Sequence, residues 1–252
     1  MSNRDIQNTK AVFKREFLAY FNSPVLYVIV VIFLLAAMGF PFFFSRILDS
    51  EDVSLTERFF VWHPWIYTVL APAVGMRLWS EEHRLGTIEL LLTMPVSPWQ
   101  AILGKFFAAS CVWLIGLTLT FPIVWTVCYL GDPDMGPIMS GYIASYLYAL
   151  ACLALTSAIS AITRSQVVCF IVSVAFCIVI ALIGDPGVTH TIVSTTPDWA
   201  AGFVRFVSYF SFMDHFFELT KGIFVFRDVF YFLSVIIVTL IITNLALRAK
   251  RA

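Results

Sequence analysis

The stretch Val25–Phe44 reads VLYVIVVIFLLAAMGFPFFF and contains no charged residue. A helix of ~20 apolar residues is long enough to cross the hydrocarbon core of a bilayer. The whole chain has a similar character, since 60% of its 252 residues are hydrophobic and only 13% are charged. A soluble domain carries about 25% charged residues, so this chain cannot cover a water-facing surface of its own. We therefore expect an all-α integral membrane protein.

Five further stretches are long and apolar enough to be spans. Each must be helical, because lipid cannot satisfy an open backbone. The second contains Pro64 and Pro72 and is expected to bend. In the fourth, small residues from Ala151 to Ala161 recur at helical spacing, which favours close helix packing over a polar lining. The six predicted spans form one domain over residues 1–252 and are 25–44, 59–76, 106–130, 138–163, 167–183 and 229–247.

The sorting of charge between loops predicts the orientation. One set of loops holds eleven Lys and Arg residues with five acids, and the other holds five basic residues with eleven acids. The positive-inside rule places the first set, with both termini, in the cytoplasm. An even number of spans also requires both termini on one side, so the count and the orientation agree.

The segment before the first span, residues 9–22, is amphipathic, with apolar positions such as Val12 and Phe17 opposite Lys10 and Lys14. This pattern predicts a helix that lies in the cytoplasmic interface of the bilayer. A plain membrane-entry helix and a helix that also touches a partner both fit it. Ser23 is expected to cap the first span, with Pro24 at its first position.

Between spans two and three lies a cytoplasmic elbow, residues 77–100, which reads RLWSEEHRLGTIELLLTMPVSPWQ. We predict one helix or two short ones over Ser80–Thr93, ended by Pro95 and Pro98. Its acids could pair with Arg or Lys of a soluble partner. A solvated surface loop is the alternative.

Between spans five and six, residues 197–226 carry aromatic residues at helical spacing. We predict two short re-entrant helices that dip into the outer leaflet, with a break at Gly222. A metal site at His215 has too few ligands nearby, so paired charges on an outer gate are favoured. The charged residues expected to face the outer water are Asp214, His215, Glu218, Lys221, Arg227 and Asp228.

The sequence lacks the residues that several kinds of chemistry require. The sequence contains no P-loop, HExxH or GxSxG motif. The predicted spans hold almost no ionisable side chain except His63, which argues against a proton relay and an intramembrane protease. The five cysteines form no CxxC pair, and zero net charge argues against nucleic acid as a partner. We expect no catalytic residue, metal or cofactor in this chain, so a transporter would need a separate motor.

The elbow resembles the motif of ABC-2 type permeases. The matching segments are Met76–Trp79, Glu81-Glu82, Gly86–Leu91, Pro95–Ser97 and Gly104–Phe106. Other segments resemble the branch of this family associated with bacterial gliding motility. They are Phe21–Pro24 with Tyr27, Phe42–Phe44, Asp214–Phe216, Gly222, Arg227-Asp228 and Tyr231–Ser234.

This resemblance implies a permease of the bacterial inner membrane that exports a substrate. It would pair with a second copy or a related permease. A separate P-loop ATPase would hold ATP and Mg, and a membrane-anchored partner with a large outer domain can accompany the branch. A non-transporting membrane scaffold is the alternative function. The implied coupling helix contains Arg77, Glu81, Glu82, Arg84, Gly86, Thr87 and Glu89. The implied outer gate contains Phe210, Asp214, His215, Phe217, Glu218, Gly222, Arg227 and Asp228.

Overall fold

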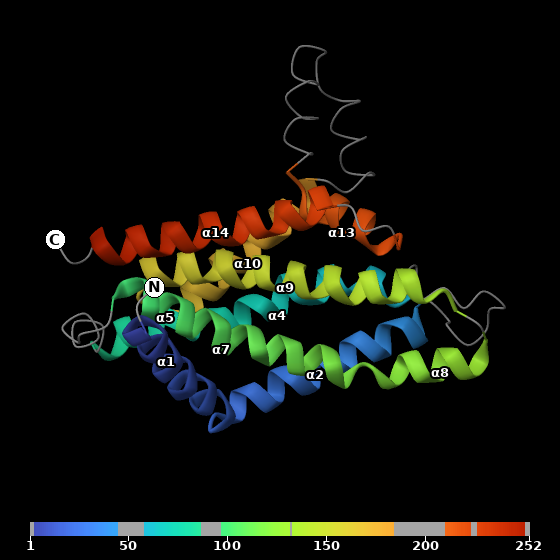
Figure 1. Cartoon of the computed structure of the whole chain (residues 1–252), viewed down its shortest axis with the longest axis horizontal. Coiled ribbons are helices and arrows are strands. Elements are labelled where there is room, and N and C mark those ends of the chain that lie inside the picture. The colour runs from blue at the N-terminus through green and yellow to red at the C-terminus, as the bar shows by residue number, and fades with distance from the viewer. Residues whose placement is uncertain are drawn as a thin grey trace, which may run out of the picture.

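The computed structural model describes residues 3–44, 58–86, 97–131, 133–183, 210–222 and 226–249. Every regular element in these ranges is a helix. The long helices lie side by side in a bundle (Figure 1). The all-α prediction is therefore confirmed for the described part of the chain.

Five helical stretches in the described ranges are long and apolar enough to cross a membrane. The second predicted span is not among them, because α4, His63–Gly75, has only 13 residues after the short helix η1, Phe60–Trp62. A sixth span at this place stays a prediction. The five stretches are α2 (Pro24–Phe43), α7 with α8 (Pro98–Leu119 and Pro122–Leu130), α9 (Met135–Ile162), α10 (Gln166–Ile183) and α14 (Phe226–Ala249).

The helix that contains the start of the predicted third span, 106–130, begins earlier, at Pro98, and the span is not one unbroken helix. Ser97 caps α7 by accepting a hydrogen bond from the backbone N–H of Gln100 at 3.3 Å, while the Gln100 side chain accepts from the N–H of Ser97 at 3.0 Å. Pro98 follows this capping box at the first helical position, so it begins a helix rather than ending one. Pro122 then separates α7 from α8, because proline has no N–H to continue a helix.

Helix α9 lies at the centre of the bundle and packs against α4, α5, α7, α10, α13 and α14. Its small residues allow this: Ala151, Ala154 and Ala161 are fully buried. The end of α4 comes so close that a Cβ added at Gly75 would lie 2.8 Å from Thr156 of α9. These contacts confirm the close-packing interpretation of the small-residue pattern.

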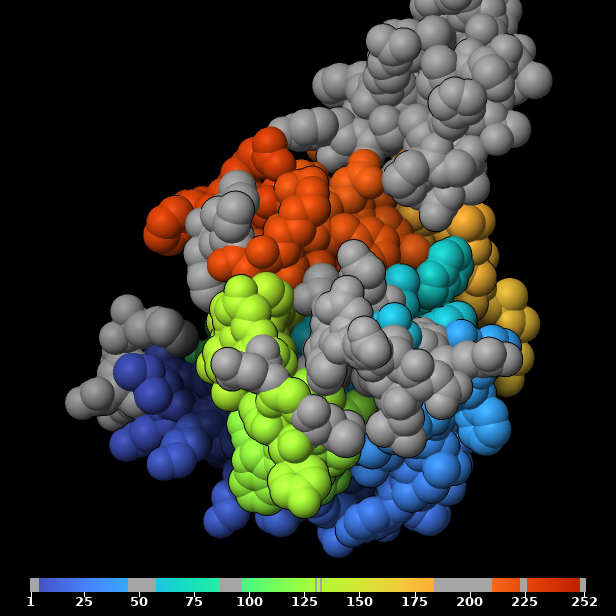
Figure 2. Space-filling view, turned by 90° about the vertical axis from the view of Figure 1, so that its right-hand side faces the viewer, coloured from blue at the N-terminus to red at the C-terminus, as the bar shows by residue number. Residues whose placement is uncertain are grey.

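The two ends of the bundle carry different elements. At one end, which we call the elbow end, lie α5 (Arg77–Leu85), α1 (Asn3–Phe21) and the C-terminal end of α14 (Figure 1). At the other, the gate end, lie α8 and α13 (Phe212–Thr220). Figure 2 looks at the gate end and shows the orange-red atoms of α13 and α14 beside the yellow-green atoms of α8 and α9. The two predicted sites therefore occupy opposite ends of the helices.

Candidate coupling and gate sites

The described part of the elbow consists of a short helix, α5, and the beginning of α7. Helix α5 follows α4 after one residue, Met76, and ends at Leu85, because Gly86 adopts a left-handed φ of +69°. The predicted start at residue 80 was therefore three residues too late, and a single helix over 80–93 was wrong because α5 stops before position 86. The alternative of two short helices stays a prediction. Arg84, Leu85 and Gly86 form the exposed tip of α5. Thr87 and Glu89, like all of 87–96, lie outside the described residues.

A buried ion cluster joins α5 to α1 and α7. The ammonium of Lys105, on α7, lies 3.2 Å from a carboxylate oxygen of Glu16 and 3.0 Å from one of Glu82. Arg15 adds a contact of 2.7 Å to Glu16 and one of 3.8 Å to Glu82. Because the Lys105 side chain is only 4% exposed, each carboxylate helps to offset the cost of burying its charge.

This cluster changes the interpretation of Glu82. The sequence suggested a carboxylate free for a soluble partner, but the side chain points inward and is 16% exposed. The cluster also affects the neighbouring acid. Burial raises the pKa of Glu16, but the charges of Lys105 and Arg15 outweigh that effect and hold its pKa below the ordinary value of 4.5.

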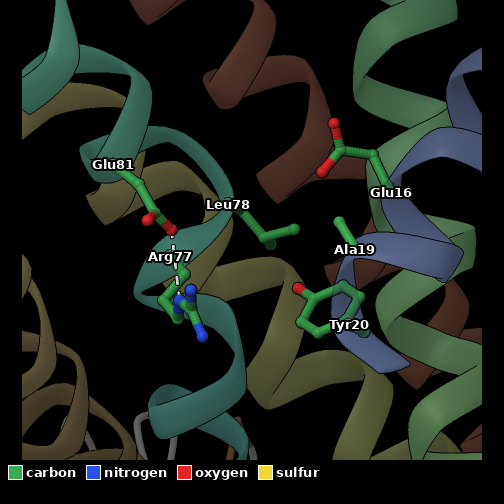
Figure 3. A pocket seen from close by; sticks show the side chains of 6 residues that line it. All are labelled: Glu16, Ala19, Tyr20, Arg77, Leu78 and Glu81. Atoms are coloured by element: carbon green, nitrogen blue, oxygen red, sulfur yellow. Dashed lines mark hydrogen bonds and ion pairs between the residues drawn. The ribbon is translucent and has the colours of Figure 1, made fainter. Parts of the chain in front are cut away.

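A second contact joins the start of α5 to Ser23, in the turn between α1 and α2. The guanidinium of Arg77 donates to Glu81 at 3.1 Å and to the hydroxyl of Ser23 at 2.9 Å. Ser23 has the backbone of a helix cap, but its side chain caps nothing, since it accepts from Arg77 instead. Figure 3 shows Arg77 and Glu81 on one side of a small pocket of about 60 Å³, with Glu16 and Tyr20 of α1 opposite.

Helix α1 is longer than the predicted segment 9–22 and lies against α7. A Cβ at Gly104 would be 2.8 Å from Val12, so glycine is needed where the two helices meet. Nearer its start, Asp5 accepts a hydrogen bond from Gln100 at 2.8 Å. One side of this helix therefore packs on protein, whatever its other side contacts.

The third attachment of α5 is to the elbow end of α9. The hydroxyl of Ser160 accepts from the backbone N–H groups of Trp79 and Ser80, at 3.1 and 3.0 Å, and donates to the carbonyl of Met76 at 3.1 Å. The indole of Trp79 also donates to Ser157 at 3.2 Å. The first N–H groups of a helix have no partner inside it, so Ser160 caps α5 from another helix.

At the gate end, α13 is tied to the start of α14 through buried charge. The Nδ1 atom of His215 donates to Asp228 at 2.7 Å, and Arg227 donates to the same carboxylate oxygen at 3.1 Å. The ring of Tyr231 stacks on His215 with a centroid separation of 3.8 Å. Gly222 has a φ of +85° and marks the predicted break after α13, but the helix that follows is α14 and not a second re-entrant helix.

The prediction that His215 and Asp228 face the outer water was wrong. They are 4% and 0% exposed, because they pair with each other and the packing of α13 and α14 covers the pair. Glu218 and Lys221 form an exposed pair at the end of α13. Phe217 is half-buried, Phe210 is 54% exposed, and Asp214 is partly exposed. The segment 197–209 lies outside the described residues.

The helices also hold more ionisable side chains than the predicted spans suggested. Lys105 lies within α7 and Asp228 within α14, and both are buried. Sequence reasoning placed them just outside the spans, because the predicted helices began too late. Lys105 could have been recognised as a single cation inside a long apolar run, but its partners on α1 and α5 could not. Within the described ranges, no three His, Cys, Asp or Glu side chains gather where they could hold a metal ion.

Comparison with known proteins gives one finding. The sequence model of a family described as "ABC-2 family transporter protein" matches residues 10–249. The match includes all of α5, α9 and α13 and most of α1. No curated protein matches the chain.

Proposed function

Since this chain belongs to the ABC-2 family of transporter proteins, we propose that it is the membrane-spanning permease subunit of an ATP-driven exporter. A separate P-loop ATPase supplies the energy, because the sequence contains no P-loop. The elbow receives the movement of that ATPase, and the gate end opens in response. Membership of the family and the five long apolar helices make the chain a multi-pass membrane protein.

The observation that carries this proposal is the way α5 is held. Helices α7 and α9 and the turn before α2 hold its sides, through Lys105, Ser160 and Ser23. Its tip projects with Arg84 exposed and Leu85 62% exposed. A helix that is fixed along its length and exposed at its tip can pass a push into the bundle. A solvated loop would yield to the push.

The proposal divides the predicted coupling residues into two groups. Arg84, Leu85 and Gly86 form the described part of the surface that meets the ATPase, and Thr87 with Glu89 continues it along the chain. Glu81 and Glu82 are paired inside the permease, so they brace the elbow. An exposed apolar side chain beside a charge is a common arrangement at protein interfaces.

Several finer features belong to the same proposal. The chain acts in a bacterial inner membrane with both termini in the cytoplasm, as the charge sorting predicts. It pairs with a second permease, and it belongs to the gliding-motility branch of the family. A membrane-anchored partner with a large outer domain can meet the gate end, where Phe210, Asp214, Phe217 and Glu218 form the described surface of the outer element.

Co-expression with a P-loop ATPase encoded beside this chain tests the proposal. The ATPase should copurify with the permease, and Arg84→Glu should lower its recovery about tenfold, the effect of ~1.4 kcal/mol at an interface. The control is Lys221→Glu, an equal charge reversal on an exposed side chain at the gate end, which should change nothing. A folded permease that recovers no ATPase would overturn the proposal. Recovery of an ATPase whose hydrolysis never alters the permease would favour a scaffold.

A further inference from the structure

Helix α9 contacts both the elbow and the outer element, and it is unbroken between them. Its 28 residues make a rod about 42 Å long at a rise of 1.5 Å per residue. Two alternative routes along the bundle, through α4 and through the third span, are interrupted. The helix α4 ends at Gly75, one residue before α5 begins, and the third span divides near Thr120. α9 is therefore a direct mechanical connection between the two sites.

The inner joint of this rod consists of hydrogen bonds. Ser160 holds two backbone N–H groups and one carbonyl around the start of α5, and Ser157 holds the indole of Trp79. His83, near the end of α5, donates to the carbonyl of Ala161 at 3.0 Å. Bonds to both ends of α5 mean that α5 cannot rotate or shift without moving this end of α9 or breaking them.

The outer joint consists of packed rings and one close backbone approach. The buried ring of Tyr148 lies 5.7 Å, between centroids, from both Phe212 and Phe216 of α13. Nearer the gate end, a Cβ at Gly222 would lie 2.9 Å from Pro137 of α9. Packed interiors transmit displacement because they hold few voids. Ser160 and Tyr148 are separated by about 18 Å along the axis.

Helix α10 also packs against α5 and α13. The difference is in the kind of contact, because the hydrogen bonds that cap the start of α5 come from α9. The backbone cap adds directional hydrogen bonds to the packing, and α10 is not seen to supply such bonds to the start of α5 in the described residues. This distinction identifies Ser160 as the residue through which α9 grips the elbow.

We propose that α9 carries the movement of the elbow to the outer gate, with Ser160 as its positioning residue at the inner joint and Tyr148 at the outer joint. The inference rests on the proposed function for the source of the movement. The mechanical link itself is a property of the isolated chain and can be measured without an ATPase. Its failure is therefore distinguishable from failure of the proposed function, which the copurification experiment decides.

The test is hydrogen exchange of the purified permease in lipid nanodiscs, comparing the native chain with Ser160→Ala. Loss of the cap should speed exchange at Trp79 and Ser80 about tenfold, as expected for ~1.4 kcal/mol of lost hydrogen bonding. Exchange across α13 should also rise, by about threefold or more, because linked sites share part of a local free-energy change. A purely local structural role would leave α13 unchanged.

Two other variants keep the result interpretable. Thr156→Val removes a hydroxyl one turn away on α9 that donates only to the Cys152 carbonyl of its own helix, and it should leave both regions unchanged. Trp79→Phe removes the indole donor to Ser157 and part of a buried ring, but it leaves the Ser160 cap at the inner joint in place. It should also speed exchange at both α5 and α13, but by less than Ser160→Ala does.

The outcomes decide the proposal. Faster exchange at both α5 and α13 in Ser160→Ala, with none in Thr156→Val, supports it. Faster exchange at α5 alone overturns the role of α9 as the connection. No change at α5 overturns Ser160 as the joint. If Ser160→Ala does not fold, the exchange rates of Trp79→Phe at α5 and α13 are judged by the same criteria.

Discussion

Lys105 is the residue at which three helices meet, since its ammonium bridges Glu16 of α1 and Glu82 of α5 while its backbone belongs to α7. Buried ion pairs contribute little against an apolar replacement of the whole group, but removal of one partner leaves charge buried without compensation. The stability of the elbow end therefore depends on the complete cluster.

Lys105→Met tests this dependence. The methionine keeps the volume but leaves two carboxylates facing each other, and we expect a loss of ~3–5 kcal/mol in the free energy of unfolding. Denaturant unfolding of the detergent-solubilised chain, followed by its helical signal, gives the value. The double variant with Glu82→Gln should recover part of the loss. A matched change in an exposed pair, Lys221→Met, should cost no more than ~0.5 kcal/mol. Equal losses for the two lysines would contradict the account.

The acid Glu16 makes the cluster sensitive to pH. Its pKa lies below 4.5 in the folded state, so the folded state favours the charged form. The stability that this provides is present above pH 4.5 and is lost as the pH falls through the folded pKa. The melting temperature should therefore drop on going from pH 6 to pH 4, and it should drop less in Glu16→Gln. Parallel pH profiles for the two proteins would show that Glu16 contributes nothing.

At the scale of elements, α1 and α7 are held together where Gly104 meets Val12. Gly104→Ala places a methyl group 2.8 Å from the valine side chain, and overpacking of this kind costs ~1–3 kcal/mol. The added change Val12→Ala should restore part of the stability, because it removes the atoms that clash. Thermal unfolding of the single and double variants measures this. A Val12→Ala change that adds its own loss to that of Gly104→Ala would place the contact elsewhere.

The elements also show how far the sequence predicts this fold. Apolar runs located α2, α9, α10 and α14 to within a few residues, because a membrane span needs a length that composition reveals. The predicted starts were too late where a helix begins with polar or charged residues. Composition cannot tell that Lys105 and Asp228 are buried and paired, so α7 and α14 were predicted to begin too late.

At the scale of the whole molecule, the resemblance of the elbow to ABC-2 permeases is confirmed for the family. The break at Gly222 could also be predicted from the sequence, because only glycine readily adopts a φ of +85°. The pairing of His215 with Asp228 and the capping of α5 by Ser160 could not be predicted from the sequence. Both join residues that are distant along the chain, and no local pattern specifies which helices become neighbours.

In the proposed mechanism, the tip of α5 that receives the movement of the ATPase lies at one end of the bundle, and the outer gate lies at the other (Figure 1). If this is right, mutations that disturb the middle of the bundle should affect the connection between the two ends without preventing the ATPase from docking. In the proposed mechanism, docking depends on the exposed tip of α5 and the residues that follow it, and all later steps depend on docking.

Site-specific cross-linking tests that docking most directly. A cysteine placed at Arg84, on the exposed tip of α5, and one placed at Tyr129, which is 92% exposed at the gate end, are compared in chains co-expressed with the neighbouring P-loop ATPase. Both use the same short bifunctional reagent in membranes. The account predicts a cross-linked product between the permease and the ATPase from the Arg84→Cys chain and none from Tyr129→Cys. A product from Tyr129→Cys alone, or from neither chain although the ATPase is present, would contradict it.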